Sequence, residues 1–231
     1  MKLNVKNYTK IIKGKIILDN INLNFVSGKV YGFFGRNGSG KTMLFRAIST
    51  MIFPTEGDVL IDNVSLINDN YDLSKIGLLI EEPGFYPFLT GKENLSMLYE
   101  INNKKDDKYI EKIMSMVGLE NNEKKYKEYS LGMKQKLRIA QAIMEKQELI
   151  ILDEPTNGLD EASVLNIYNI VKKLKKENKL ILIASHNKDD LKLLCDKVYK
   201  IDNGKICGEM VLWKIECSWL YWVLFWFCMY L

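Results

Sequence analysis

The sequence has 231 residues, of which 47% are hydrophobic and 27% are charged. This length and composition exclude a disordered, a collagen-like and a small disulfide-rich protein, and they leave one large domain or a domain with a small lobe. The net charge is only +4, and the basic residues are almost all lysine. Because arginine is the side chain best suited to phosphates and base edges, we expect no nucleic-acid partner.

The four cysteines show no CxxC spacing, and the chain has a single histidine. This pattern favours neither a structural zinc site nor a disulfide framework. The N-terminal residues lack the apolar segment of a secretory signal. We therefore expect a cytoplasmic protein.

Short apolar runs alternate with amphipathic stretches along the chain. The apolar runs predict strands at Val30–Phe34, Ile76–Ile80, Leu149–Leu152 and Leu180–Ala184. Apolar spacings of three and four predict helices at Tyr109–Val117, Lys134–Met144 and Ala162–Lys176. An Asn203-Gly204 turn predicts a hairpin of Lys197–Ile201 with Lys205–Cys207. This order predicts an α/β fold with a parallel sheet, a small antiparallel β lobe and a helical lobe over approximately residues 83–140.

The stretch 209–231 departs from this pattern, because residues 217–231 are uncharged and rich in aromatic side chains. A helix of this length is too short to cross a bilayer. Three interpretations stay open: a segment that docks on a membrane surface or a partner, a buried terminal element, or a tail without an evolved role. A shift of reading frame near Val211 would produce the third.

A glycine-rich segment directly follows the first predicted strand and fits the pattern G-x-x-x-x-G-K-[ST]. Its members are Gly35, Arg36, Asn37, Gly38, Ser39, Gly40, Lys41 and Thr42. Glycines let the backbone point successive N–H groups at phosphate oxygens, and the following helix adds its positive end. We expect Lys41 to contact the β- and γ-phosphates and Thr42 to bind Mg²⁺. A plain glycine-rich turn is the alternative.

Two acidic residues, Asp153 and Glu154, end the predicted strand at Leu149–Leu152. The carboxyl end of such a strand is where α/β sheets bind ligands. We expect Asp153 to hold Mg²⁺ and Glu154 to act as general base or to position the attacking water. Taken alone, the pair could equally form a solvated turn or a helix cap.

His186 follows the predicted strand at Leu180–Ala184, at the same sheet edge as Asp153. An isolated histidine is commonly a surface or core residue. Beside a phosphate site, its ring could reach a γ-phosphate oxygen and distinguish ATP from ADP. We therefore count His186 with Glu154 as a candidate catalytic residue.

Taken in order, these motifs and the segment Tyr129-Ser-Leu-Gly-Met-Lys-Gln135 resemble the ATP-binding subunits of ABC transporters. The resemblance covers residues 1–208, and the Ser130 segment resembles the signature specific to that family. It implies that Ser130 and Gly132 contact the ATP held by a second subunit, so that two chains enclose two nucleotides. It also implies that Asp160 communicates across this dimer. Both Ser130 and Asp160 could alternatively be ordinary helix caps.

A narrower resemblance, to the bacitracin- and lantibiotic-resistance branch, comes from the stretch that begins at Ile76 and contains Glu81. That branch often has glutamate where most transporters carry the Q-loop glutamine. The resemblance implies that Glu81 contacts nucleotide and Mg²⁺. It also implies that the nearby Pro83, Phe85, Tyr86 and Phe88 receive the membrane subunit, although these aromatics could instead form an internal apolar loop.

Two departures from the family pattern accompany this resemblance. The adenine-stacking aromatic is expected at Ile12, which is not aromatic, and Tyr8 lies too early in the chain. In addition, members of the resistance branch generally continue past the ATPase core, whereas here the match ends near Gly208.

These observations predict an Mg²⁺- and ATP-dependent ATPase that powers a separate membrane permease, which the resemblance suggests exports a peptide antibiotic or a hydrophobic compound. The partners expected are the permease and a second ATP-binding subunit in a homodimer, on the inner face of the cell membrane. The alternatives are a soluble ABC-type ATPase not coupled to transport, a truncated cassette that binds ATP without coupling, and a kinase or GTPase with the same phosphate loop.

Overall fold

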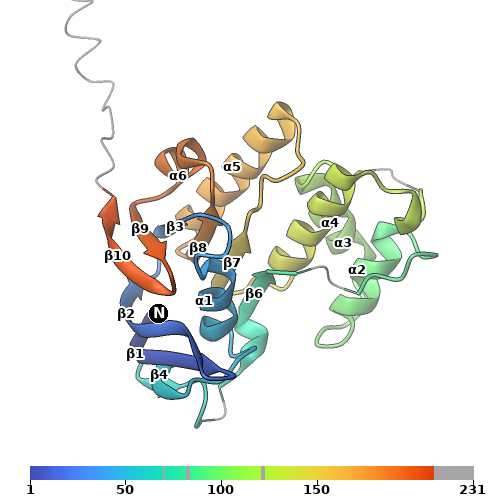
Figure 1. Cartoon of the computed structure of the whole chain (residues 1–231). Coiled ribbons are helices and arrows are strands. Elements are labelled where there is room, and N and C mark those ends of the chain that lie inside the picture. Colours follow the sequence, from blue (N-terminus) through green and yellow to red (C-terminus); the bar gives the residue numbers. More distant parts are fainter. Residues whose placement is uncertain (70, 82–83, 121–122, 211–231) are drawn as a thin grey trace, which may run out of the picture.

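Two β-sheets of different topology form the framework of the protein, shown by a computed structural model that describes residues 1–69, 71–81, 84–120 and 123–210 (Figure 1). The larger sheet has the strand order β10-β9-β3-β8-β7-β6. Its strands are β3 (Val30–Phe34), β6 (Ile76–Leu79), β7 (Leu149–Asp153), β8 (Leu180–Ser185), β9 (Lys197–Asp202) and β10 (Lys205–Met210). All pairs are parallel except the β9–β10 hairpin. The predicted parallel sheet is confirmed.

The smaller sheet is antiparallel and has the order β2-β1-β4-β5. Its strands are β1 (Lys2–Ile12), β2 (Lys15–Val26), β4 (Glu56–Ile61) and β5 (Val64–Ser65). The pairing of β1 with β2 shifts register after Val5, Tyr8 and Lys10. Such irregularities break the two-residue alternation of apolar side chains, so the sequence predicts a β lobe but not the limits of these strands.

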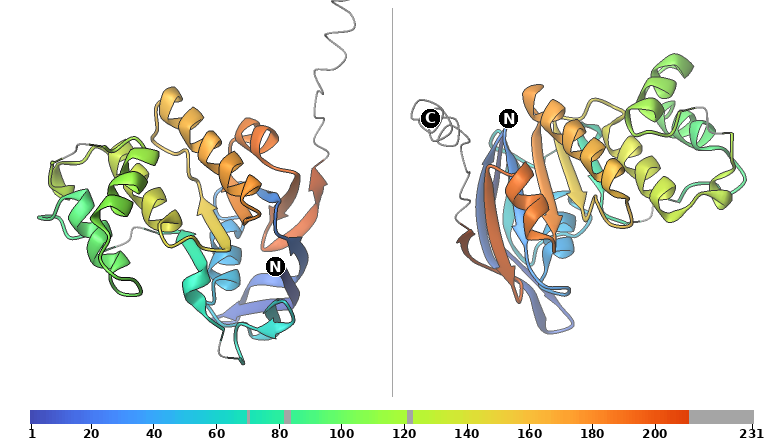
Figure 2. Two further views of the ribbon diagram at one scale, coloured as in Figure 1. Left: turned by 180° about the vertical axis from the view of Figure 1, so that it is seen from behind. Right: turned by 90° about the horizontal axis from the view of Figure 1, so that it is seen from above.

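The larger sheet separates two apolar cores, because alternate residues of each strand point to opposite faces. Ile150 and Leu152 of β7 face a core shared with α5 (Glu161–Lys176) and α6 (Lys188–Leu194). Leu149 and Ile151 face the second core, which contains α1 (Lys41–Ile48) and the inner face of the smaller sheet. The result is a layered molecule in which α1 lies between the two sheets (Figures 1 and 2).

The helical lobe lies to one side, beside the edge strand β6 (Figure 2). It contains α2 (Gly91–Tyr99), α3 (Asp107–Met116) and α4 (Leu131–Ile143). Short 3₁₀ turns occur at Leu73–Lys75, directly before β6, and at Tyr126–Glu128, between α3 and α4. Helix α4 packs closely on β6, since a Cβ atom on Gly77 would lie only 1.9 Å from the Ala142 carbonyl oxygen.

The helix limits follow from their caps. The predicted helix at Lys134–Met144 begins three residues earlier, at Leu131, because the Ser130 hydroxyl accepts a hydrogen bond from the Met133 N–H. Helix α2 was not predicted as an element, although Thr90 and Glu93 form a capping box at its start.

Strand β10 extends to Met210, two residues past the boundary expected at Gly208. The interpretations of the aromatic tail fall on 211–231, which lie outside the described residues. Within the described part of the chain, no helix is both long enough and apolar enough to cross a membrane.

Candidate active site

The predicted phosphate loop connects β3 to the first residue of α1. Gly38 and Gly40 adopt φ values of +78° and +110°. Gly40 is the residue before α1 and offers no side-chain cap, so the first N–H groups of the helix stay available to a ligand. Positive φ at these two positions is accessible to glycine with little strain, which explains the residue types of the motif.

A cleft of about 520 Å³ lies over this loop. Its walls are formed by the phosphate loop, the end of β7, the start of β2 and the β9–β10 turn. The lining residues are Lys15, Ile16, Ile17, Asn37, Gly38, Ser39, Gly40, Lys41, Thr42, Met43, Asp153, Glu154, Asn203 and Gly204. The structure thus brings together the loop and both strand-end acids, which are more than one hundred residues apart in the sequence.

Lys41 is the buried cation of the cleft, with 6% of its surface exposed. Its ammonium donates hydrogen bonds to the carbonyl oxygens of Gly35, at 2.8 Å, and Arg36, at 3.4 Å. The same Nζ atom lies 3.8 Å from Glu154 Oε1. The loop therefore holds a positive charge at the place where the sequence predicts phosphate.

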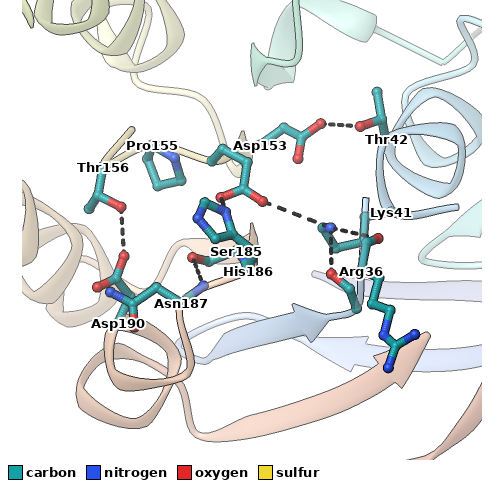
Figure 3. A network of polar contacts seen from close by, with 12 residues as sticks. Arg36, Lys41, Thr42, Asp153, Pro155, Thr156, Ser185, His186, Asn187 and Asp190 are labelled. Atoms are coloured by element: carbon teal, nitrogen blue, oxygen red, sulfur yellow. Dashed lines mark hydrogen bonds and ion pairs between the residues drawn. The ribbon is translucent and has the colours of Figure 1, made fainter. Parts of the chain in front are cut away.

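Thr42 and Asp153 form the candidate Mg²⁺ site. The Thr42 hydroxyl donates to Asp153 Oδ2 at 2.5 Å (Figure 3), whereas the buried Asp153 Oδ1 has no hydrogen-bond partner among the described residues. Burial raises the pKa of the Asp153 carboxyl, an effect that the Thr42 hydrogen bond opposes and the Glu154 charge reinforces. An unpartnered carboxylate oxygen beside a hydroxyl is an oxygen-only donor pair that suits Mg²⁺.

No group of three His, Cys, Asp or Glu side chains with metal-binding spacing occurs among the described residues. A site made of one hydroxyl and one carboxylate fits a cation that keeps several waters and takes its remaining ligands from nucleotide phosphates.

Glu154 and His186, the two candidate catalytic residues, are in direct contact. Glu154 Oε2 lies 2.8 Å from His186 Nδ1 and accepts a hydrogen bond from the His186 backbone N–H at 3.3 Å. Glu154 has a φ of +50°, which is unfavourable for a residue with a side chain. Backbone strain of this kind at a carboxylate that faces a phosphate loop is typical of a functional residue.

Glu81 occupies a different environment from the one predicted for a Mg²⁺ ligand. Its carboxylate is exposed and forms an ion pair with the Arg46 guanidinium. Arg46 lies close enough to Asp153 for its charge to favour the ionised form of that carboxyl. Contact of Glu81 with Mg²⁺ would require this ion pair to open.

Ser130, Gly132 and Asp160 do not line the cleft. Ser130 caps α4, and Asp160 caps α5 by accepting a hydrogen bond from the Ser163 N–H at 2.8 Å. Gly132 lies against the following loop, since a Cβ atom there would be 3.2 Å from the Gly158 carbonyl oxygen. The capping alternatives are therefore correct, and they leave the predicted contacts with a second subunit open.

At the start of β2 the cleft is lined by Lys15, Ile16 and Ile17, none of which is aromatic. Tyr8 is fully buried, and its hydroxyl donates to the Ile52 carbonyl, so it is not exposed to a base. Ile12 is exposed but does not line the cleft, whereas Ile16 lines it and is 51% exposed. Sequence reasoning missed Lys15 and Ile16, because their position depends on the β1–β2 hairpin.

The predicted permease-facing aromatics separate into two groups. Phe85 is buried and packs edge-on against Tyr126, with 5.1 Å between ring centroids. Its assignment to the surface is wrong, because its ring belongs to the same buried cluster as Tyr126 and Leu95. Tyr86 and Phe88 are exposed, and Pro83 lies outside the described residues.

Comparison with known proteins agrees with the geometry. The family model described as ABC transporter matches residues 18–157. An uncharacterized ABC transporter ATP-binding protein of Bacillus subtilis (strain 168), YybJ, is 44% identical over 214 residues, which are 92% of this chain and 98% of that protein. The bacitracin transport ATP-binding protein BcrA of Enterococcus faecalis is 38% identical over 211 residues, which are 90% of this chain and 68% of that protein. The predicted resemblance to this branch is confirmed.

A solved structure of similar fold is the dimeric ATP-binding cassette MJ0796 in a post-hydrolysis state, bound to ADP and Pi. The two structures align with a TM-score of 0.82 and 26% identity, over 91% of this chain and 98% of that one. This likeness confirms the predicted phosphate-loop fold.

Proposed function

Because the chain belongs to the ABC transporter family, as an ATP-binding subunit with ATPase activity, we propose that Glu154 is the carboxylate that drives its hydrolysis of ATP. The observation that carries this proposal is the position of Glu154 on the cleft, between the His186 ring and the Lys41 ammonium. A carboxylate there can accept a proton from the water that attacks the γ-phosphate. His186 orients Glu154 and contacts the same phosphate.

The remaining cleft residues bind and position the nucleotide. The N–H groups of Gly35–Thr42 cradle the phosphates, and Lys41 exchanges its carbonyl partners for β- and γ-phosphate oxygens. Thr42 and Asp153 hold Mg²⁺, which neutralises phosphate charge when it is bound. Glu81 joins this site once it leaves Arg46.

A second copy of the chain completes each site. Ser130 and Gly132, at the start of α4, contact the γ-phosphate of the ATP bound to the opposite subunit, and Asp160 reaches across the same interface. Two observations support this proposal. Ser130, Gly132 and Asp160 do not line the chain's own cleft, and the similar MJ0796 cassette is dimeric.

The dimer acts on a membrane permease, which places the chain on the cytoplasmic face of the cell membrane. We assign export of a peptide antibiotic or a hydrophobic compound, on the strength of Glu81 and the likeness to a bacitracin transport protein. Exposed Tyr86 and Phe88 supply part of the surface that receives the permease.

The hydrolytic assignment is tested with the purified chain and its Glu154→Gln variant. We expect Glu154→Gln to lower kcat by about a hundredfold or more while ATP still binds. Because ATP then persists, size-exclusion chromatography with Mg-ATP should show a stable dimer. Undiminished turnover in Glu154→Gln would refute the role of Glu154, and a monomeric variant with ATP bound would refute the shared site.

The transport assignment is tested by measuring bacitracin resistance in cells from which the gene that encodes this chain has been deleted. Expression of the wild-type chain should restore resistance, and expression of Glu154→Gln should not. Equal restoration by both would show that resistance does not require hydrolysis. No restoration by an active wild-type ATPase would exclude bacitracin as the substrate.

A further inference from the structure

Gln135 connects the helical lobe to the loop that contains the hydrolytic residue. It lies in the second turn of α4, and only 6% of its surface is exposed. Its side-chain amide donates to the carbonyl oxygens of Glu154, at 3.1 Å, and of Pro155, at 3.0 Å. Both hydrogens of one buried amide are thus used on the two residues that follow β7.

These two hydrogen bonds act on a strained part of the backbone. Glu154 has a φ of +50°, and such a conformation costs about 1–2 kcal/mol for a residue with a side chain. It persists only where neighbouring groups hold the backbone. On the other side, the Glu154 N–H donates to the Ala184 carbonyl of β8 at 2.9 Å. The peptide groups on both sides of the Glu154 Cα are therefore fixed, and they determine where its carboxylate points.

Arg138, one turn later in α4, determines how the Gln135 amide is oriented. Its Nη1 atom donates to Gln135 Oε1 at 3.2 Å. Because the amide oxygen is occupied by a cation, the NH₂ group faces the two carbonyls. The link from α4 to Glu154 therefore has a defined donor and a defined acceptor at each step.

We propose that Gln135 is a positioning residue that makes hydrolysis conditional on the docking of α4 against the end of β7. When α4 is docked, the two hydrogen bonds hold Glu154 with its carboxylate toward His186 and Lys41. When α4 shifts, both bonds break and the Glu154 backbone relaxes out of its strained conformation. This inference rests on the proposed role of Glu154.

Gln135→Met removes both donors at similar side-chain volume, and Gln147→Met is the matched control. Gln147 is also buried and lies beyond the other end of α4, beside Gly77. For Gln135→Met we expect kcat to fall about tenfold, the effect of roughly one to two hydrogen bonds, with an unchanged KM for ATP. Gln147→Met should keep the wild-type kcat. Both melting temperatures are measured, so that loss of fold is seen directly.

Gln135→Glu provides a second test with the original side-chain shape. Beside the Arg138 guanidinium, the introduced carboxylate is ionised at neutral pH and donates no hydrogen bond to either carbonyl. At pH 7.5 its kcat should therefore fall at least as far as that of Gln135→Met, with KM for ATP unchanged. A wild-type kcat in Gln135→Glu would contradict the positioning role.

The remaining outcomes distinguish failure of this inference from failure of the proposed function. A wild-type kcat in Gln135→Met, or an equal loss in Gln147→Met, would overturn the inference, as would a change confined to KM. If Glu154→Gln is inactive while Gln135→Met is fully active, the inference alone fails. If Glu154→Gln remains active, the proposed function fails, whatever Gln135→Met does.

Discussion

At the scale of single residues, Asp153 combines burial with an incomplete set of partners. Its Oδ2 atom accepts from Thr42, but its buried Oδ1 atom has no partner among the described residues. A buried polar atom without a hydrogen bond destabilises the folded state by about 1–3 kcal/mol. The arrangement that suits Asp153 for binding a cation therefore lowers the stability of the folded protein when no cation is bound.

We predict that Asp153→Asn stabilises the metal-free protein by about 1 kcal/mol, because a neutral amide is less costly to bury than a carboxylate. Denaturant unfolding at pH 7 in EDTA measures this difference. Mg-ATP should stabilise the wild type and have a much smaller effect on the variant. A less stable variant in EDTA would show that the Thr42–Asp153 contact outweighs the burial of the charge.

Ile16 is the second residue with a testable role, because it lines the cleft at the start of β2. If the chain binds ATP as proposed, we expect the base to lie against this side chain. We predict that Ile16→Trp lowers the KM for ATP about fivefold at constant kcat, since stacking of a base on an aromatic ring contributes about 1 kcal/mol. Ile12→Trp is the matched control, because Ile12 is exposed but does not line the cleft. An effect at Ile12 alone would place the base near the end of β1 instead.

At the scale of elements, the β9–β10 turn joins the phosphate loop to β2. The Gly204 N–H donates to the Ser39 carbonyl at 2.9 Å, and the Gly204 carbonyl accepts from the Asp19 N–H at 3.0 Å. A Cβ atom on Gly204 would lie 2.1 Å from the Ile17 carbonyl oxygen. This close approach fixes the distance between the phosphate loop and the start of β2.

We predict that Gly204→Ala raises the KM for ATP and lowers the melting temperature, because the added methyl group separates β2 from the phosphate loop. Gly14→Ala is the control: its φ of +75° is close to the +71° of Gly204, but a Cβ atom there would meet nothing within 4 Å. Both variants share the cost of positive φ, about 1–2 kcal/mol. Only Gly204→Ala should alter KM, and equal KM values would exclude the spacing role.

The strands that carry the site were predictable because each is a short apolar run that ends in functional residues. The predicted limits of β3 are confirmed, and β7 and β8 each extend one residue further. The start of α4 was predicted three residues late because the apolar spacing that indicates the helix begins at Lys134, whereas the Ser130 cap sets the first helical residue at Leu131. The link from Gln135 to Glu154 was not predictable, since no local pattern shows that these residues, 19 positions apart, become neighbours.

At the scale of the whole molecule, two nearby aromatic side chains are expected to have different roles. We expect Phe85 to stabilise the fold and Phe88 to contribute to contact with the permease. Phe88 is 70% exposed, with the Lys127 ammonium 4.9 Å from its ring centroid, whereas Phe85 belongs to the core. We predict that Phe88→Asp keeps the ATPase rate and melting temperature of the isolated chain but fails to restore resistance in cells. Phe85→Ala should instead lower the free energy of unfolding by about 3 kcal/mol. Restored resistance with Phe88→Asp would show that this side chain is not needed for coupling.

The strand order of the larger sheet also constrains how the protein can be made. Val30 of β3 pairs with Ile181 of β8, and Tyr31 pairs with Lys197 of β9. At a translation rate of about 5–20 residues per second, β8 is therefore synthesised roughly 7–30 seconds after β3, and β9 later still. Throughout that interval, β3 and its glycine-rich loop lack the neighbouring strands β8 and β9 that position the loop in the folded protein. A nascent chain should therefore gain affinity for ATP only after β8 and β9 have been synthesised.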